Sequence, residues 1–340
     1  MSKKKSFLFI ILLLLLSFTV PHLTYAQDEN VDYSVQAHLP DNQLDTKQTY
    51  FDLRVKPKQS QQLEVEIFNN EQEAITVHTD IYNASTNRNG LIVYEEQEEI
   101  SDSLDVPLSD ILTLEDEEVE VPAGESRKVS AELEMPEESF DGIILGGFYF
   151  EKDTEEEAEN EGVNIDNKYS YVIGVQLSQN DDDVEPELSL ESVTPELTDY
   201  RTSVVATIQN KQPVIMEDLT IEAKVYEENE EKPIQEVKDN NFKMAPNSDL
   251  SYTIDWEDRS LEAGDYILHL TAEDKNDQWE WEEPFTIEKE EADEINKEAA
   301  NVDKGNYTLW FILGIVVLFA IIAGLLLYIR KLKKDKTAEA

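Results

Sequence analysis

The chain of 340 residues contains no cysteine. This absence excludes disulfide bonds, cysteine-ligated zinc and thiol nucleophiles. Basic residues are also scarce, because 28 Lys and Arg stand against 75 Asp and Glu, and the formal net charge is −47. A protein that binds nucleic acid needs clustered Lys and Arg to neutralise phosphates, so the composition excludes nucleic acid as a partner.

The little positive charge that exists is concentrated at the two ends of the chain. Residues 1–26 and residues 310–340 each carry a net charge of +3, which leaves −53 on residues 27–309. Such an acidic segment disfavours direct contact with an anionic lipid surface. It is nevertheless rich in Val, Ile, Leu and aromatic residues, so we expect it to fold. Its length predicts roughly two domains, each with its own core.

The first 26 residues are typical of a secretory signal peptide. Three lysines precede an apolar stretch from Phe7 to Val20, which is too short to span a membrane, and Pro21 ends it. The small residues Thr24 and Ala26 predict cleavage before Gln27. An uncleaved N-terminal anchor is the alternative interpretation.

A second apolar segment lies near the C-terminus. The segment Trp310–Ile329 is a run of 20 uncharged residues, enough for a helix to cross the hydrocarbon core of a bilayer. Basic residues follow it and acidic residues precede it. By the positive-inside rule, residues 330–340 are then cytoplasmic and residues 27–309 extracellular. The sequence predicts a single-pass cell-membrane protein with a transmembrane helix over residues 309–329.

The extracellular segment alternates apolar and polar residues in the manner of β-strands, as residues 63–67 illustrate. Two further segments, 143–150 and 169–175, are almost continuously apolar, which predicts strands buried on both faces. Turn-forming residues separate the strands, and residues 109–114 favour a short helix. The acidic residues 153–161 predict a solvated loop between two core strands.

We predict an all-β fold with two immunoglobulin-like β-sandwich domains in tandem. The first domain covers residues 27–180, an acidic linker covers residues 181–187, and the second domain covers residues 188–287. Seven predicted strands in the second domain are typical of an immunoglobulin-like sandwich, and Tyr266 is a candidate for its tyrosine corner. Residues 288–308 lack an apolar face, so we expect an acidic stalk there.

Little in the sequence predicts catalysis. The extracellular histidines stand alone, and no nucleophile elbow or phosphate-binding loop is present. The acid clusters lack the spacing of a calcium loop, so solvated surface charge is the simpler interpretation. Carboxylate pairs suited to glycoside cleavage remain open, because the acids are so abundant. We expect no enzyme activity, no catalytic residue, no metal site and no cofactor.

Three tryptophans of the second domain are candidates for partner binding, namely Trp256, Trp279 and Trp281. Trp279 and Trp281 are two residues apart, so they lie on the same face of one strand. Aromatic residues dominate the energetics of protein interfaces, which favours a protein-binding surface. A position on the core face of the second domain is the alternative.

Several segments carry a resemblance to a known family. They are the segment from Tyr33 to Gln43, Tyr-Phe-Asp-Leu at residues 50–53, Ala-Ser-Thr-Asn-Arg-Asn-Gly at residues 84–90, and a Gly-Gly strand within residues 140–150. Together with the order of signal peptide, two β-domains, membrane span and basic tail, they resemble the WxL-interacting proteins of Gram-positive bacteria. One departure is Pro57-Lys58, where the family often has Pro-Gly in a turn.

The resemblance implies a function. The first domain is similar to a peptidoglycan-binding module, and the second is similar to a module that binds the WxL domain of secreted, wall-attached proteins. The implied function is that of a non-catalytic, membrane-anchored adaptor that tethers an extracellular complex at the cell wall. The alternative is an extracellular receptor or hydrolase that acts on cell-wall glycan.

Within the segments that carry the resemblance, polar and glycine residues are the candidates for ligand contact. They are Asn42, Gln43, Asn87, Asn89, Gly90, Tyr94, Gly146 and Gly147. Their amides could bind sugar hydroxyls or peptide groups, but turn structure is the alternative for the asparagines and for Gly90. The two adjacent glycines within an apolar strand predict a bulge or a close approach of another backbone.

Overall fold

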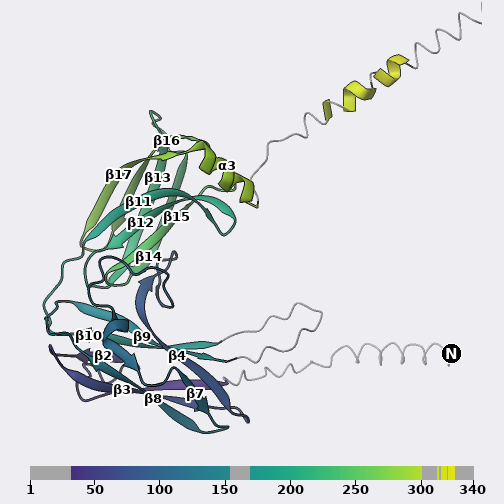
Figure 1. The fold of residues 1–340 in the computed structure, drawn as a ribbon. Coiled ribbons are helices and arrows are strands. Elements are labelled where there is room, and N and C mark those ends of the chain that lie inside the picture. Colours follow the sequence, from purple (N-terminus) through teal and green to yellow (C-terminus); the bar gives the residue numbers. More distant parts are fainter. Residues whose placement is uncertain (1–31, 154–168, 301–311, 314, 320, 326–340) are drawn as a thin grey trace, which may run out of the picture.

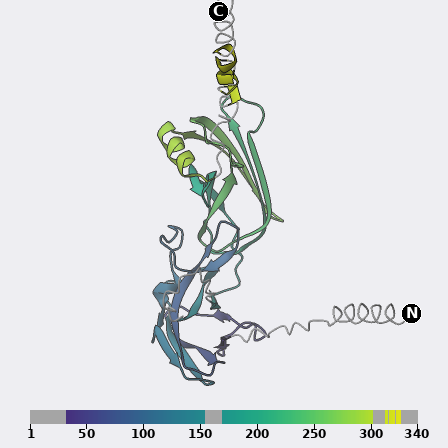
Figure 2. The ribbon, with the colours of Figure 1, turned by 90° about the vertical axis from the view of Figure 1, so that its right-hand side faces the viewer.

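The computed structural model describes residues 32–153, 169–300, 312–313, 315–319 and 321–325. The predicted signal peptide, the basic tail and most of the predicted acidic loop lie outside the described residues. Two β-domains follow one another along the long axis of the molecule (Figure 1). The view turned by 90° shows the same elongated arrangement (Figure 2). The all-β prediction is therefore confirmed.

The first domain packs two sheets against each other. The smaller sheet has the order β1-β3-β8-β6, with bounds β1 (Tyr33–His38), β3 (Ser60–Asn69), β8 (Ser126–Glu134) and β6 (Leu112–Leu114). The larger sheet has the order β2-β10-β9-β4-β5, with β7 also paired to β4, and bounds β2 (Phe51–Arg54), β10 (Ser170–Ser178), β9 (Ile143–Lys152), β4 (Ile75–Thr86), β5 (Ile92–Tyr94) and β7 (Glu118–Val121). All these pairs are antiparallel except β2 with β10.

Alternation along the strands builds the core of the first domain. In β3, Leu63, Val65 and Ile67 are buried while the glutamates between them are only partly covered. The near-continuous burial predicted for residues 143–150 is confirmed by β9. The same prediction for residues 169–175 is wrong, because Val172 is 38% exposed. Among the described residues, Tyr169 just before β10 is also exposed, at 55%.

A short helix, α2 (Leu108–Ile111), leads directly into β6. The helix expected over residues 109–114 is therefore confirmed only in its first half, because residues 112–114 are a strand. Leu108 is fully buried and packs on the inner side of β9. This contact matters for the glycines of β9, which are described below.

The second domain also consists of two sheets. One has the order β11-β12-β15, with bounds β11 (Leu188–Thr198), β12 (Arg201–Asn210) and β15 (Ser248–Asp255). The other has the order β14-β13-β16-β17, with bounds β14 (Gln235–Met244), β13 (Met216–Glu227), β16 (Gly264–Glu273) and β17 (Gln278–Ile287). All seven predicted strands are present. The tyrosine corner is confirmed too, since the Tyr266 hydroxyl donates to the Glu262 carbonyl oxygen at 2.8 Å.

The segment after β17 forms a helix, α3 (Lys289–Glu298), which lies beside the second domain (Figure 1). Its composition favours a helix, but the expectation that it lacks an apolar face is wrong. Ala292 is buried and Ile295 packs against the core of the second domain. Asn296 exchanges hydrogen bonds of 2.8 Å with the backbone of Leu261. The first turns of the expected stalk are therefore docked on the second domain.

The two domains meet at a junction with a buried centre. Ala84 and Leu145 of the first domain pack with Ala245 of the second. The Thr86 hydroxyl lies 2.6 Å from the Ser248 hydroxyl and accepts a hydrogen bond of 2.9 Å from the Ala245 N–H. Because these polar groups are buried and satisfied, the junction is a specific contact rather than a loose tether.

The predicted membrane span over residues 309–329 is only partly described. Within its described residues, no helix combines the length and the apolar character that crossing a bilayer requires. The anchor remains a prediction from the sequence.

Candidate functional site

The outer face of the larger sheet of the first domain carries a cluster of aromatic side chains. Strand alternation turns Phe148 and Phe150 of β9 into the core, so Tyr149 between them faces outward. The outward positions hold four half-buried tyrosines, which we call the tyrosine face: Tyr50, Tyr82, Tyr94 and Tyr149. Solvent-facing positions of an antiparallel sheet are usually polar, so such a cluster is a candidate binding surface.

A row of glycines lies between the tyrosines. Gly147 of β9 pairs with Gly174 of β10 on one side and with Tyr82 of β4 on the other. A Cβ placed on Gly174 would lie 3.7 Å from Tyr50 and 3.9 Å from the Tyr94 hydroxyl, so both side chains reach the same place. Because glycine has no side chain, Gly147 and Gly174 leave space on the sheet for the tyrosine rings.

Gly146 and Gly147 are needed for close packing. A Cβ on Gly146 would lie 2.5 Å from both Leu108 Cδ2 and the Tyr82 carbonyl oxygen, and one on Gly147 would lie 2.9 Å from the Ile173 carbonyl oxygen. The predicted close backbone approach is confirmed, whereas the pairing of β9 with both neighbours runs without a bulge. Gly146 faces the interior, and only Gly147 belongs to the tyrosine face.

On one side of the tyrosine face, the tyrosine hydroxyls are hydrogen-bonded to carboxylates. The rings of Tyr82 and Tyr149 lie 5.2 Å apart between centroids. The Tyr82 hydroxyl donates to Asp80 at 3.3 Å, and the Tyr149 hydroxyl donates to Glu151 at 2.9 Å. Burial, and after it the negative charge of Asp80, raises the pKa of Tyr82 to about 12. Tyr82 therefore stays neutral at physiological pH.

The other side of the tyrosine face is positioned by a buried amide. The Gln43 side chain donates to the Tyr50 carbonyl oxygen at 3.0 Å and accepts from the Asp52 N–H at 3.1 Å. The Asn42 amide donates to the Arg54 carbonyl oxygen at 3.0 Å. Both predicted ligand-binding amides thus bond to the backbone at or beside β2, and Gln43 holds the backbone of Tyr50 in place.

The predicted Asn87–Gly90 loop lies away from the tyrosine face, at the junction between the domains. The Asn87 side-chain oxygen accepts hydrogen bonds from the N–H groups of Asn89 and Leu91, at 3.0 and 3.1 Å. Gly90 has a φ of +66°, and its carbonyl oxygen accepts a hydrogen bond of 2.8 Å from the N–H of Lys243 in the second domain. The turn interpretation of this loop therefore agrees with the structure.

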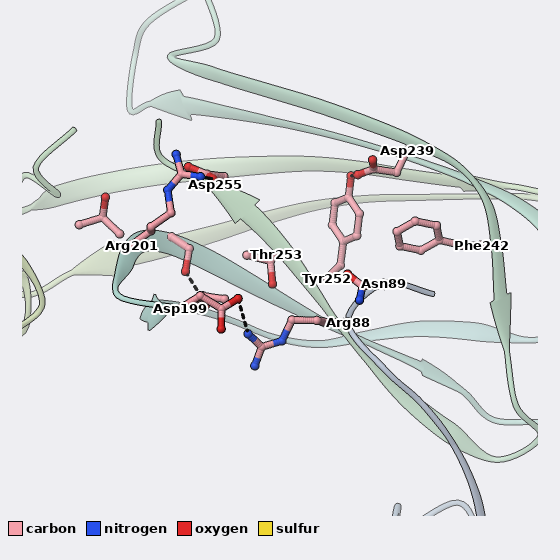
Figure 3. A pocket seen from close by; sticks show the side chains of 12 residues that line it. Arg88, Asn89, Asp199, Arg201, Asp239, Phe242, Tyr252, Thr253 and Asp255 are labelled. Atoms are coloured by element: carbon pink, nitrogen blue, oxygen red, sulfur yellow. Dashed lines mark hydrogen bonds and ion pairs between the residues drawn. The ribbon is translucent and has the colours of Figure 1, made fainter. Parts of the chain in front are cut away.

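Asn89 is exposed and lines a pocket of about 370 Å³ between the domains (Figure 3). Arg88 contributes from the same loop and lies 3.4 Å from Asp199, while Arg201 lies 3.0 Å from Asp255. Each arginine is paired with an aspartate, and a third aspartate of the lining, Asp239, accepts a hydrogen bond of 2.8 Å from the Tyr252 hydroxyl. The pocket is lined by residues of both domains, and its carboxylates outnumber its arginines by one.

The three predicted tryptophans are separated by the fold. Trp256 is 3% exposed and packs edge-to-face on Tyr266 in the core of the second domain, so its predicted role in partner binding is wrong. Trp279 and Trp281 share the core-facing side of β17, at the edge of the sheet, and are half-buried there. The four-stranded sheet is wider than the facing three-stranded one, which leaves its edge less covered.

Sequence reasoning found Tyr94 and Gly147 but missed Tyr50, Tyr82 and Tyr149. Their position in the alternating pattern could have revealed them, because each tyrosine stands at an outward-facing strand position where a polar residue is usual. In the described residues, no group of three or more His, Asp or Glu side chains is arranged to hold a metal ion.

Two family models cover most of the described chain. One, for the peptidoglycan binding domain of WxL interacting proteins, matches residues 33–152. The other, for the host binding domain of WxL interacting proteins, matches residues 160–297. The chain belongs to the WxL-interacting protein family. The structure places β10 in the sheet of the first domain, although the second match begins before it.

No curated protein matches this chain. Among solved structures, the E. coli chaperone DraB is similar at 11% identity, with a TM-score of 0.28 over 75% of this chain and 95% of its own. The CupB2 chaperone of Pseudomonas aeruginosa is similar at 11% identity, with a TM-score of 0.26 over 66% of this chain and 91% of its own.

Proposed function

We propose that this WxL-interacting protein is a non-catalytic, membrane-anchored adaptor at the cell surface. Its first domain binds peptidoglycan through the tyrosine face, and its second domain binds a protein partner. The predicted signal peptide and C-terminal span would place both domains outside the cell, with residues 330–340 in the cytoplasm. The protein would thereby tether an extracellular complex between membrane and wall.

The observation that carries this proposal is the tyrosine face in the domain whose family is named for peptidoglycan binding. Half-buried aromatic side chains are fixed in place by the sheet, so little conformational entropy is lost when a ligand covers them. The surface extends across several strands, which suits a polymer better than a small substrate. A polymer-binding surface needs no catalytic group.

The test is co-sedimentation of the purified full-length protein with purified peptidoglycan. We expect the wild-type protein to sediment, and the double variant Tyr82→Ala/Tyr149→Ala to remain largely in solution. The matched control changes the exposed Tyr200 of the second domain to Ala. A wild-type protein that stays in solution would refute peptidoglycan binding. Equal sedimentation of the wild type and the double variant would refute the tyrosine face as its site.

The partner of the second domain is a separate part of the proposal. The sequence resemblance favours a WxL-domain protein, and the half-buried Trp279 and Trp281 on the edge strand β17 are the surface we assign to it. In a pull-down with a purified WxL domain, Trp279→Ala/Trp281→Ala should reduce retention, and Tyr82→Ala should not. Retention that is unaffected by the tryptophan variant would exclude this surface.

The membrane anchor is testable by fractionation. The full chain should remain in the membrane fraction after an alkaline carbonate wash, and deletion of residues 309–340 should release it. An anchored protein that releases soluble sugar or peptide from purified wall would instead support the hydrolase alternative, especially if a single Asp→Asn or Glu→Gln change abolished the release.

A further inference from the structure

We infer that the tyrosine face recognises the neutral glycan strand of peptidoglycan, and that the acidic groups around it reject the charged stem peptides and other anionic wall polymers. This inference rests on the proposed function, because it names the chemistry bound at that same surface. It depends on three observations: the row of residues across the sheet, the charge around it, and the hydrogen-bonding groups it presents.

The first observation is the shape of the surface. Tyr50, Gly174, Gly147 and Tyr82 form one row across four neighbouring chain segments of the sheet. Strands in a sheet are about 4.8 Å apart, so this row spans roughly 14 Å. An oligosaccharide of a few residues has a similar length. Its sugar rings present apolar C–H faces that can stack on aromatic rings, as flat apolar groups do elsewhere.

The second observation is the charge around the row. On the described strands, the outward positions between the four tyrosines include Asp52 and Asp80 but neither Lys nor Arg. The nearest outward arginine, Arg54 at the end of β2, is ion-paired with Asp181. A ligand with carboxylates or phosphates would meet negative charge without a cation to offset it. An uncharged glycan avoids this cost.

The third observation is the set of hydrogen-bonding groups. Asp52 and Asp80 offer carboxylate oxygens, and the Tyr82 hydroxyl, whose proton is directed to Asp80, offers an acceptor oxygen. Gln176, which donates to Asp52 at 3.2 Å, fixes that carboxylate. The surface is therefore rich in acceptors, and the hydroxyl and N-acetyl N–H groups of amino sugars are the donors that match it.

The experiment compares two fragments of peptidoglycan as ligands of the full-length protein. A tetramer of N-acetylglucosamine represents the glycan strand, and a synthetic stem pentapeptide with a free terminal carboxylate represents the peptide. Titration calorimetry should detect the sugar and not the peptide. Because the sugar is uncharged, its affinity should be the same at low and high salt.

Variants separate stacking from folding. Tyr82→Ala/Tyr149→Ala should weaken sugar binding at least tenfold, and Tyr82→Phe/Tyr149→Phe, which keeps the rings, should lose less than the alanine pair. Tyr200→Ala is the matched control, and an unchanged unfolding temperature of the phenylalanine pair shows that the sheet is intact. Equal losses in the alanine and phenylalanine pairs would overturn stacking as the basis of recognition.

The outcomes distinguish this inference from the proposed function. Binding of the pentapeptide without the tetramer, or sugar binding that weakens steeply with salt, would overturn the inference. Co-sedimentation with peptidoglycan could still succeed in either case, and the proposed function would stand. If the wild-type protein failed to co-sediment with peptidoglycan, both this inference and the proposed peptidoglycan binding would be refuted.

Discussion

The two domains differ in what their widest sheets present to solvent. The outer face of the β14-β13-β16-β17 sheet is charged: Glu222 accepts hydrogen bonds from Lys224 and Lys238, and His269 lies 3.6 Å from Glu282. The outer face of the larger first-domain sheet instead carries tyrosines over paired glycines. One surface therefore remains solvated, whereas the other retains aromatic area that a ligand can cover.

The difference shows that aromatic residues in two β-domains can serve either the stability of the core or the binding of a ligand. In the second domain the large aromatic residues Trp256, Tyr252 and Tyr266 lie inside. In the first domain the phenylalanines fill the core, and tyrosines are also placed outside. Burial of aromatic side chains stabilises a fold, and their partial exposure leaves surface for recognition.

The largest expected effect is a loss of stability when a core aromatic residue of the second domain is truncated. Trp256→Ala removes a buried ring that contacts Tyr266 and lies 5.8 Å from the Arg259 guanidinium. Truncation of a buried tryptophan costs about 3–5 kcal/mol, so the second domain should unfold at a clearly lower temperature in calorimetry. Peptidoglycan retention should persist. Trp279→Ala, at a half-buried site, is the control and should cost less.

A smaller effect is expected at the glycines under the tyrosine face. Gly146→Ala places a methyl group against Leu108 and the Tyr82 backbone, and such overpacking costs about 1–3 kcal/mol in urea unfolding. Gly174→Ala is the matched control, because its added Cβ has no neighbour closer than 3.7 Å. Equal stability of the two variants would contradict the close packing of β9.

The tyrosine face also predicts a pH dependence. The pKa of Tyr82 is raised from 10.0 to about 12, so the folded protein holds this proton more tightly than the unfolded chain. The stability from this group is present below pH 10 and is lost as the pH rises from 10 towards 12. Tyr82→Phe should flatten that part of the curve of unfolding free energy against pH, and Tyr200→Phe should not. Identical curves for wild type and Tyr82→Phe would argue that Tyr82 is solvated.

The smallest effect is expected on the charged outer face of the second domain. Its lysine partners lower the pKa of Glu222, but ion pairs at a surface contribute at most about 1 kcal/mol. Glu222→Gln should therefore change urea unfolding little and should leave sedimentation with peptidoglycan unchanged. A loss of sedimentation would show that the charged outer face of the second domain also takes part in peptidoglycan binding.

Much of the architecture could be predicted from the sequence, because local patterns carry it. The seven strands of the second domain follow from alternation and turn residues, and the tyrosine corner follows from Tyr266 at the start of a late strand. The predicted close approach at Gly146 and Gly147 also agrees with the structure. Each of these features depends on residues that are near in sequence or on a backbone requirement of one residue type.

The candidate site could be predicted only in part. Tyr94 and Gly147 were identified, but their assembly with Tyr50 and Tyr82 depends on strands that are distant in sequence. Trp256 was misplaced because a single apolar residue does not reveal which side of a sheet will be covered. The docking of α3 was missed because Ala292 and Ile295 are too few to mark an apolar face among so many charges.

The sequence by itself determined the all-β class, the absence of cysteine chemistry and the strongly acidic charge of residues 27–309, because composition and short-range periodicity carry that information. Tertiary structure alone decided which aromatic residues became core and which became surface. Strand order and register across the sheet place Tyr50, Gly174, Gly147 and Tyr82 in one row. Such a row arises from pairings between distant segments, and no local pattern in the chain encodes them.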